Sequence, residues 1–148
     1  MMRIIPEIKT TRLSLHPLTQ HDQAAIADIK AISHIKAQDW INLRLAESGF
    51  SSYVWMVEYK DLLIGTVCFW NIENHQAEIG YEILPAYRKQ GFAIEACVAL
   101  LDIAPVLGLK KIEAFCDKTN VASIQTALKA GFDYDRSWED FDVYTKLI

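Results

Sequence analysis

The pattern of apolar and polar residues changes its period along the chain, and each period predicts one kind of element. Alternating apolar and polar positions are typical of half-buried strands, and an apolar position every three or four residues is typical of helices. Alternation predicts strands over residues 11–16, 53–59, 62–70, 76–84, 111–116, 132–138 and 141–147. The longer period predicts helices from residue 19 or 21 to 32, over 35–47, from 90 to just before Pro105, and over 120–130.

The spacing of apolar residues within the predicted helices also indicates which side faces the core. The residues expected to point inward are Ala25, Ile26, Ile29, Ile32, Trp40, Leu43, Ala46, Ile94, Cys97, Val98 and Leu101. Gly49 and Gly131 are expected to end two helices, because glycine readily takes the left-handed conformation found there. The element order β-α-α-β-β-β-α-β-α-β-β predicts an α/β fold with a mixed sheet and helices on both faces.

Length and composition bound the function. The 148 residues contain no evident linker or repeat, which predicts one domain over 1–148 with the first six residues as a loose terminus. A net charge of −4 predicts no nucleic-acid partner and suits a cationic substrate such as an amine. The sequence has neither an apolar run of about 18 residues nor a signal peptide, so we expect no membrane partner and a cytoplasmic location.

The three cysteines, Cys68, Cys97 and Cys116, lie apart from one another inside apolar stretches. This placement predicts small core residues in a reducing compartment, with neither a disulfide nor a metal site. The four histidines fall at element ends or in turns, so we expect them to be surface or capping residues.

The stretch from Arg88 to Ala93, R-K-Q-G-F-A, joins a predicted strand to a predicted helix. At such a junction several backbone N–H groups lack helical partners, and together with the helix dipole they favour an anion. Gly91 lets the backbone approach a phosphate closely, and Arg88 and Lys89 add positive charge. The stretch indicates a site for the diphosphate of a nucleotide-like cofactor, although a helix-start turn with solvated basic side chains has the same pattern.

The spacing does not match the three-glycine dinucleotide fingerprint or the Gly-Lys-Ser/Thr ending of the Walker motif. The stretch instead has the order basic-x-x-Gly-x-Ala after a strand. This order resembles the acetyl-CoA loop of the GNAT N-acetyltransferase superfamily. Further stretches resemble its RimJ/RimL-type branch, in the same order: T-T-R-L-S-L (10–15), A-E-I-G-Y-E-I-L-P (77–85), N-V-A-S (120–123) and K-A-G-F (129–132). The chain departs from that branch in a shorter segment before Tyr53 and in His16, where the branch usually has Arg.

The resemblance implies a GNAT fold that uses acetyl-CoA as co-substrate, and it assigns roles on the donor side. Backbone N–H groups of the loop would hold the diphosphate, and two basic side chains would lie near by. The cofactor-binding residues of this loop are Arg88, Lys89, Gln90, Gly91, Phe92 and Ala93. In the family, the strand before this loop splays from its neighbour at a bulge and opens a slot for the pantetheine arm. A backbone N–H of that strand, here Ile83 or Leu84, would hold the thioester carbonyl.

Asn120 and Ser123 begin the last predicted helix. An N-cap role, worth about 1 kcal/mol, is sufficient to explain Asn120, and the resemblance adds a hydrogen bond to the pantetheine arm. Ser123 would protonate the departing CoA thiolate or simply bind the cofactor. Many relatives carry a tyrosine acid four residues after this serine, where this chain has Ala127.

The acceptor amine must be neutral to attack, which requires a general base or a water chain to one. Glu78 and Glu82 share one face of the strand over 76–84, among apolar neighbours, and are the candidate bases. Glu78 fits the family's strand better, and Glu82 lies nearer the expected thioester. A solvent-facing strand edge would also explain both, and Glu139 and Asp140 in the closing hairpin are alternatives.

The sequence therefore predicts an N-acetyltransferase that moves acetyl to a primary amine by direct attack in a ternary complex, without a metal. The acceptor would be a protein N-terminus, as the branch resemblance implies, or a small amine. The chain is expected to be a monomer or a homodimer. The main alternative is a non-catalytic CoA-binding sensor or scaffold domain, and a domain for another nucleotide is a third possibility.

Overall fold

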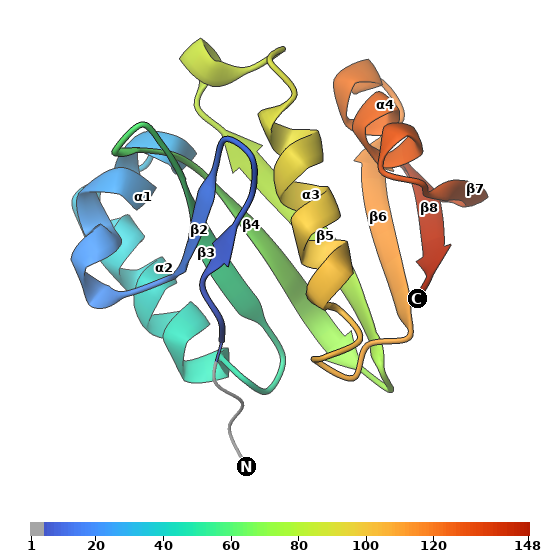
Figure 1. The fold of residues 1–148 in the computed structure, drawn as a ribbon, viewed down its shortest axis with the longest axis horizontal. Helices are drawn as coiled ribbons and strands as arrows, with labels where there is room; N and C mark the ends of the chain where they lie inside the picture. The colour runs from blue at the N-terminus through green and yellow to red at the C-terminus, as the bar shows by residue number, and fades with distance from the viewer. Residues whose placement is uncertain (1–4) are drawn as a thin grey trace.

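The computed structural model describes residues 5–148, so the expected loose terminus lies partly outside the described residues. The strands of this part form one sheet in the order β1-β2-β3-β4-β5-β6-β8-β7 (Figure 1). Strands β1 to β8 span Ile8–Lys9, Ser14–Pro17, Tyr53–Tyr59, Leu62–Glu73, Gln76–Ile83, Lys111–Asp117, Asp133–Trp138 and Phe141–Leu147. The β5–β6 pair is parallel, and the other neighbouring pairs of the described sheet are antiparallel.

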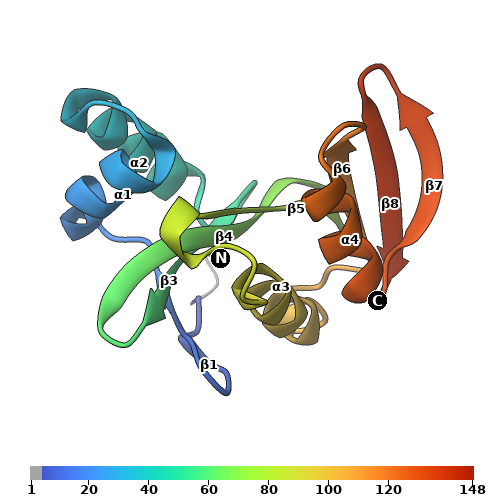
Figure 2. The ribbon, with the colours of Figure 1, turned by 90° about the horizontal axis from the view of Figure 1, so that it is seen from above.

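Helices lie on both faces of this sheet. The α-helices α1 to α4 span Gln23–Lys30, His34–Glu47, Phe92–Ile103 and Val121–Lys129, and the 3-10 turns η1 and η2 span Gln20–Asp22 and Pro85–Tyr87. Helices α1 and α2 cover one face, and α3 and α4 cover the other (Figure 2). Two parallel neighbouring strands need a crossover connection, and α3 supplies it between β5 and β6. The predicted fold class is confirmed, and so is the element order, to which the structure adds the short strand β1 at the start.

Each face has its own hydrophobic core. The larger core, under α3 and α4, includes the fully buried side chains of Trp55, Phe69 and Phe92. The smaller core, under α1 and α2, includes Ile26 and Ile41, also fully buried. The sheet is therefore anchored from both sides over its central strands.

Strand β5 contributes to these two faces in alternation. Ala77, Ile79 and Ile83 belong to the larger core, on the side of α3. Because successive side chains of a strand point to opposite faces, Glu78 and Glu82 lie on the face of α1 and α2. The prediction that these two glutamates share a face is confirmed.

Some predicted inward positions are wrong. Leu43 and Val98 are 53% and 40% exposed, and Ala46 is exposed as well. Helix α2 instead buries Ala37 and Ile41, which lie one turn apart on a single narrow stripe. Leu43 is two residues beyond Ile41, about 200° further around the helix, so it faces solvent.

Two predicted boundaries also move. Residues 11–13 form a bend before β2 and not the start of a strand, because the Thr10 hydroxyl accepts a hydrogen bond from the Leu13 N–H (3.0 Å) and closes a turn. Helix α3 begins at Phe92 and not at Gln90, because Gly91 has a φ of 81°. Both shifts matter below, since the turn and the loop lie against each other.

Candidate active site

Strands β5 and β6 begin side by side and then separate. Their pairing is limited to Gln76 with Lys111, Ala77 with Ile112, and Glu78 with Glu113. Beyond Glu78, β5 therefore has no paired strand on its β6 side within the described sheet. Figure 2 shows β6, β8 and β7 turning away from β5. We call the opening between β5 and β6 beyond Glu78 the splay. It has the place and orientation that the family resemblance implied.

The expected bulge lies elsewhere. The register between β4 and β5 is regular from Gly65–Ile83 to Trp70–Glu78. It shifts only between Trp70 and Glu73 of β4, before the splay opens. The separation of β5 from β6 is therefore not produced by an extra residue in β5.

Peptide groups of a strand point alternately to its two sides, and this identifies the groups that face the splay. The Leu84 N–H donates to the Ile64 carbonyl of β4 at 2.8 Å. The N–H groups of Tyr81 and Ile83 consequently point away from β4, into the splay. Leu84 as the thioester donor is wrong, because its N–H is already engaged. Ile83 remains a candidate, and Tyr81 joins it.

The loop after β5 leads directly into the N-terminus of α3. Lys89 and Gly91 both take left-handed backbone conformations, with φ of 63° and 81°. Gly91 precedes the first residue of α3, and no side chain caps this helix end. The first N–H groups of α3 and its dipole therefore face the loop without competition from a side-chain oxygen, which is the arrangement that binds anions.

The side chains of the loop mainly hold its shape. The Arg88 Nε donates to the Ile83 carbonyl at 2.8 Å, which ties the loop back to the end of β5. The Gln90 amide donates to the Ala86 carbonyl at 3.3 Å. Arg88 thus leaves positive charge near the loop while its Nε is engaged within it. A direct contact of Arg88 or Lys89 with a bound phosphate remains a prediction.

The start of α4 forms the other wall of the splay. The Asn120 side-chain oxygen accepts a hydrogen bond from the Ser123 N–H at 3.0 Å, so the predicted N-cap is confirmed. The Ser123 hydroxyl lies 3.4 Å from the Cys116 sulfur of β6. Ser123 is half-buried and lies on the side of α4 that faces the sheet. The pantetheine contact of Asn120 remains a prediction.

Tyr81 lies opposite this wall and was not singled out from the sequence. It alternates with Glu82, so its ring points to the side of α3 and α4 and packs against the larger core. Its hydroxyl lies near the Ser123 and Thr126 hydroxyls of α4, which lower its pKa. Burial raises the pKa of Tyr81 above its usual value of 10, and this outweighs the lowering by the two hydroxyls. The phenol therefore stays protonated and able to donate.

The position of Tyr81 bears on the missing tyrosine of α4. Ala127 is buried, and it lies next to Thr126 and one turn after Ser123. A phenol hydroxyl therefore reaches this part of α4 from β5 and not from the helix itself. A usable signal existed in the sequence, because a tyrosine alternating with glutamates on a strand presents its hydroxyl to the apolar face.

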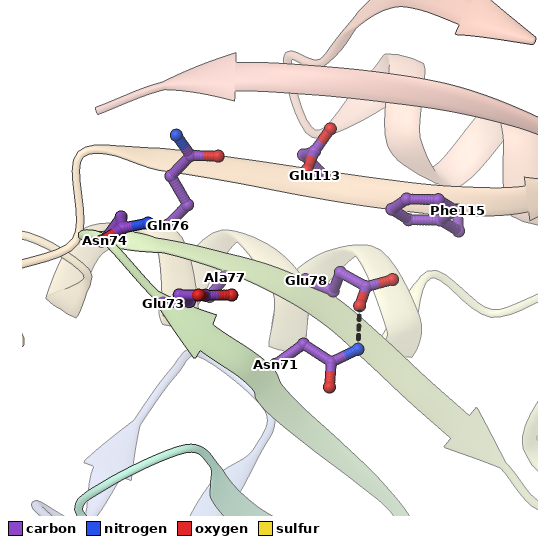
Figure 3. A pocket seen from close by; sticks show the side chains of 8 residues that line it. All are labelled: Asn71, Glu73, Asn74, Gln76, Ala77, Glu78, Glu113 and Phe115. Atoms are coloured by element: carbon purple, nitrogen blue, oxygen red, sulfur yellow. Dashed lines mark hydrogen bonds between the residues drawn. The ribbon is translucent and has the colours of Figure 1, made fainter. Parts of the chain in front are cut away.

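On the opposite face, beside the start of the splay, lies a polar pocket of about 210 Å³ (Figure 3). It is lined by Asn71, Glu73, Asn74, Gln76, Ala77, Glu78, Glu113 and Phe115. Glu78 accepts a hydrogen bond from the Asn71 amide, and Glu113 pairs with Arg136 at 2.8 Å. Glutamates from neighbouring strands make this acidic pocket attractive to a cation.

Glu82 has a different environment from Glu78. It forms an ion pair with Lys30 of α1, whose side chain is only 18% exposed. The Lys30 ammonium also lies 4.5 Å from the centre of the Trp40 ring of α2. Glu82 is therefore paired with a cation from α1, whereas Glu78 has a neutral amide partner beside an open pocket.

The three cysteines have raised pKa values. Burial raises the pKa of Cys97 to about 12 and that of Cys68 to about 11. Burial also raises the pKa of Cys116, against the lowering by Ser123. At neutral pH these groups remain thiols, so none of the three is a ready nucleophile.

The other sequence candidates lie apart from the splay or in turns. Glu139 and Asp140 form the exposed turn between β7 and β8, and neither lines the acidic pocket. His16 pairs with Glu7 and Glu58 at the far side of the sheet. Residues 5–148 hold no cluster of three or more His, Cys, Asp or Glu side chains arranged for a metal ion. In the same range, no helix is both long and apolar enough to span a bilayer.

Comparison with known families decides what this geometry belongs to. Residues 12–133 match the acetyltransferase (GNAT) domain, from the turn before β2 to the start of β7. The chain belongs to the GNAT acetyltransferase family. The family, the fold and an acetyl-CoA-dependent N-acetyltransferase activity, as predicted from the sequence, are confirmed.

Named relatives agree with this family. The uncharacterized N-acetyltransferase YoaA of Bacillus subtilis is 29% identical, over 87% of this chain and 84% of that protein. The ribosomal-protein-serine acetyltransferase of Escherichia coli is also 29% identical, over 72% of this chain and 66% of that protein. The structure of RimL, a ribosomal L7/L12 α-N-protein acetyltransferase solved with CoA, superposes with a TM-score of 0.86 at 18% identity, covering 97% of this chain and 98% of that one.

The GNAT chain has features that fit acetyl-CoA. The uncapped N-terminus of α3 suits the diphosphate, because Gly91 brings no side chain into the loop. The splay leaves backbone N–H groups of β5 without strand partners, which suits the amide and thioester groups of the rest of the molecule. The donor side is thus a set of unpaired backbone groups on a rigid frame.

Proposed function

We propose that this enzyme acetylates the α-amine of a protein or peptide N-terminus by direct attack on acetyl-CoA, with Glu78 as general base. The observation that carries the proposal is the splay between β5 and β6. The uncapped helix end lies beyond β5 on the donor side, and the acidic pocket lies beside the splay on the opposite face. Donor and acceptor would therefore meet in the opening from opposite faces of the sheet.

On the donor side, the backbone from Gln90 to Ala93 would hold the diphosphate. Asn120 and Ser123 would contact the pantetheine arm, and the N–H of Ile83 or Tyr81 would hold the thioester carbonyl. When bound, acetyl-CoA supplies an acyl group on a thiol of ordinary pKa, about 8.5, which is a good leaving group. The protein's task is then to orient this group and to move protons.

On the acceptor side, Glu78 would accept the proton of the incoming ammonium through a chain of waters, because it lies three residues before Tyr81 and five before Ile83 on β5. Its carboxylate has the Asn71 amide as a fixed partner and lies in a pocket open to solvent. Glu82 is the alternative base, but it would have to give up its ion pair with Lys30 to act. The contrast between these partners supports Glu78.

Tyr81 would hold the proton needed at the departing sulfur. Its phenol lies near the Ser123 and Thr126 hydroxyls, so hydroxyl groups of β5 and α4 would line one wall of the splay. Tyr81 and Ser123 would serve in place of the tyrosine absent from position 127. A covalent enzyme intermediate is not required, because the cysteines remain thiols.

An N-terminal α-amine is favoured over a small amine by the character of the pocket. Small-molecule sites are concave and mostly apolar, whereas this pocket is lined mainly by Asn, Gln and Glu side chains. The relatives named for acetylation of ribosomal-protein N-termini support the same acceptor class. The N-terminal ammonium of a peptide can enter such an open pocket while the rest of the peptide stays outside it.

Thiol release from acetyl-CoA, measured over a panel of short peptides, tests this acceptor. Each peptide is used with a free N-terminus and with a blocked one, and each carries a lysine so that the ε-amine serves as an internal comparison. Polyamines form a further group. We expect the rate of thiol release to be at least about tenfold higher with free N-termini than with blocked peptides, because Glu78 must meet an α-ammonium.

Two results would contradict the proposal in different ways. Faster release with polyamines or blocked lysine peptides would replace the N-terminus by another amine. Binding of CoA without release by any member of the panel would favour the non-catalytic sensor or scaffold domain.

A further inference from the structure

The turn between β1 and β2 lies against the loop that precedes α3, although 70 or more residues separate them in sequence. Arg12 is the centre of this contact. Its Nη1 donates to the Gln90 carbonyl at 2.9 Å, and its guanidinium lies 4.3 Å from the centre of the Phe92 ring. A Cβ atom added to Gly91 would come within 3.3 Å of the Arg12 Nη2. The arginine therefore packs directly on the segment that joins the loop to the helix.

Glu95, in the first turn of α3, holds Arg12 in this position. Its carboxylate accepts hydrogen bonds from the Arg12 Nε at 2.7 Å and from the Arg12 backbone N–H at 2.9 Å. The Thr10 hydroxyl donates to the same carboxylate. Burial raises the pKa of Glu95, but the hydrogen bonds from Thr10 and Arg12 lower it by more. The pKa of Glu95 is therefore below its usual value. Glu95 is therefore charged and fully engaged at neutral pH.

The contact with the Gln90 carbonyl has a geometric consequence for the loop. In a trans peptide unit the C=O and the following N–H point in opposite directions. With the Gln90 carbonyl held toward Arg12, the Gly91 N–H must point away from Arg12. Without this contact the peptide unit could rotate, since the left-handed Gly91 tolerates many backbone conformations.

We propose that Arg12, held by Glu95 and Thr10, is a positioning residue that fixes the Gln90–Gly91 peptide so that its N–H points at the CoA diphosphate. This inference rests on the proposed placement of the diphosphate in the loop. It gives a function to side chains of the T-T-R-L stretch, residues 10–13. Arg12 acts from behind the loop and not by touching the ligand.

The guanidinium is needed as a shape as well as a charge. Arg12 uses Nε for Glu95 and Nη1 for Gln90 while its flat face covers Phe92. A lysine has one ammonium and cannot make both hydrogen bonds in this geometry. The Arg12→Lys variant therefore separates the positioning role from a general electrostatic one.

Calorimetric titration of the full chain with CoA tests the inference. We expect the Kd for CoA to rise about tenfold in Arg12→Ala, because the loop must then be ordered on binding, and to recover only in part in Arg12→Lys. Arg136→Ala is the matched control, since Arg136 is also a half-exposed arginine paired with a glutamate and lies in β7, and its Kd should be unchanged. The melting temperature of each variant is measured in parallel.

A short thioester donor separates positioning from damage to the fold. S-acetylpantetheine lacks the diphosphate, so its kcat/KM should be the same in wild type and Arg12→Ala. An equal loss with both donors would mean that Arg12 supports the fold and not the diphosphate site. Full affinity for CoA in Arg12→Ala, or full recovery in Arg12→Lys, would also overturn the inference.

A loop variant tests the placement on which the inference rests. Gln90→Glu puts a negative charge beside the proposed diphosphate and should weaken CoA binding about fivefold at low salt. If Gln90→Glu binds CoA normally, the diphosphate is not in the loop and the donor half of the proposed function fails. If Gln90→Glu weakens binding and Arg12→Ala does not, only the inference about Arg12 fails.

Discussion

The two sides of the splay are built on different principles. The proposed donor side consists of backbone N–H groups. Contacts of adjacent peptide groups fix their directions, namely that of the Leu84 N–H with β4 and that of the Gln90 carbonyl with Arg12. The acceptor side consists of carboxylate and amide side chains around an open pocket. Proteins that share a fold differ in function through their sites. A backbone site suits an invariant ligand, and a side-chain site can be changed by single substitutions.

The largest test of this contrast is on the acceptor side. Glu78→Gln keeps the size of the side chain but cannot accept a proton, so kcat/KM for the acceptor should fall about 100-fold. The rise of kcat/KM with pH should also disappear, while the Kd for CoA stays the same. Steady-state rates over a pH series and a CoA titration measure both quantities.

Glu82→Gln is the matched variant for this test, because it changes the same residue type on the same strand face. A small effect is expected, since Glu82 is engaged with Lys30. If Glu82→Gln removes the pH dependence and Glu78→Gln leaves it intact, the two assignments are reversed.

The second test lies in the splay itself. Tyr81→Phe removes only the hydroxyl that faces Ser123 and Thr126, and kcat should fall about tenfold with little change in the KM for acetyl-CoA. Because the pKa of Tyr81 is raised above 10, wild-type activity should show no loss of this donor up to about pH 9. Single-turnover rates of both proteins check the expectation.

Tyr134→Phe provides a control, since Tyr134 carries an exposed hydroxyl on β7 bonded to Ser137 at 3.0 Å. Its kcat should match that of the wild type. A Tyr81→Phe enzyme with unchanged kcat would leave Ser123 or water as the proton source.

The third test concerns the frame of the donor side. Asn120→Ala removes the cap of α4 and should lower the free energy of unfolding by about 1 kcal/mol. Asn120→Asp keeps a capping oxygen and should retain most of the stability. Urea denaturation gives both values. If CoA binding weakens in Asn120→Asp as well, the amide has a role beyond the cap.

The smallest expected effect is on stability and concerns His16, a surface residue away from the donor and acceptor sides of the splay. The hydrogen bond from His16 to Glu58, and then that to Glu7, raise the pKa of His16 against the lowering by burial. The resulting stability is fully present below about pH 6.5, the unfolded value, and is lost as the pH rises through the higher folded pKa. His16→Gln should therefore lower the free energy of unfolding slightly in acid and not at about pH 9. The loss should be at most a few tenths of a kcal/mol, because the side chain is 36% exposed. An equal loss at both pH values would show that the charge of His16 contributes nothing.

Much of the fold was accessible from the sequence because its signals are local. The alternation in residues 53–59 and 141–147 predicted β3 and β8 with their observed bounds. Asn120 was read correctly as a cap, since a capping oxygen needs only the next few residues. The inward face of α2 was wrong, because apolar spacing alone did not show that only the stripe of Ala37 and Ile41 meets the sheet.

The candidate site was accessible in part. The loop from Arg88 to Ala93 and the shared face of Glu78 and Glu82 follow from motif order and a period of two. The direction of the Leu84 N–H was not accessible, because it depends on which neighbour β4 supplies. The alternation of Tyr81 with the glutamates indicated the face of its ring, but not its neighbours Ser123 and Thr126, which lie some forty residues away on another element.

The sequence by itself determined the family, the order of the elements and the loop that begins α3, because these depend on contiguous residues. Only the tertiary structure decided how the groups on those elements combine. It ended the β5–β6 pairing at Glu78, gave Glu78 and Glu82 different partners, and brought Arg12 against Gln90. These outcomes depend on contacts between distant segments, which are set by the packing of the whole sheet and are not encoded in any one stretch of the chain.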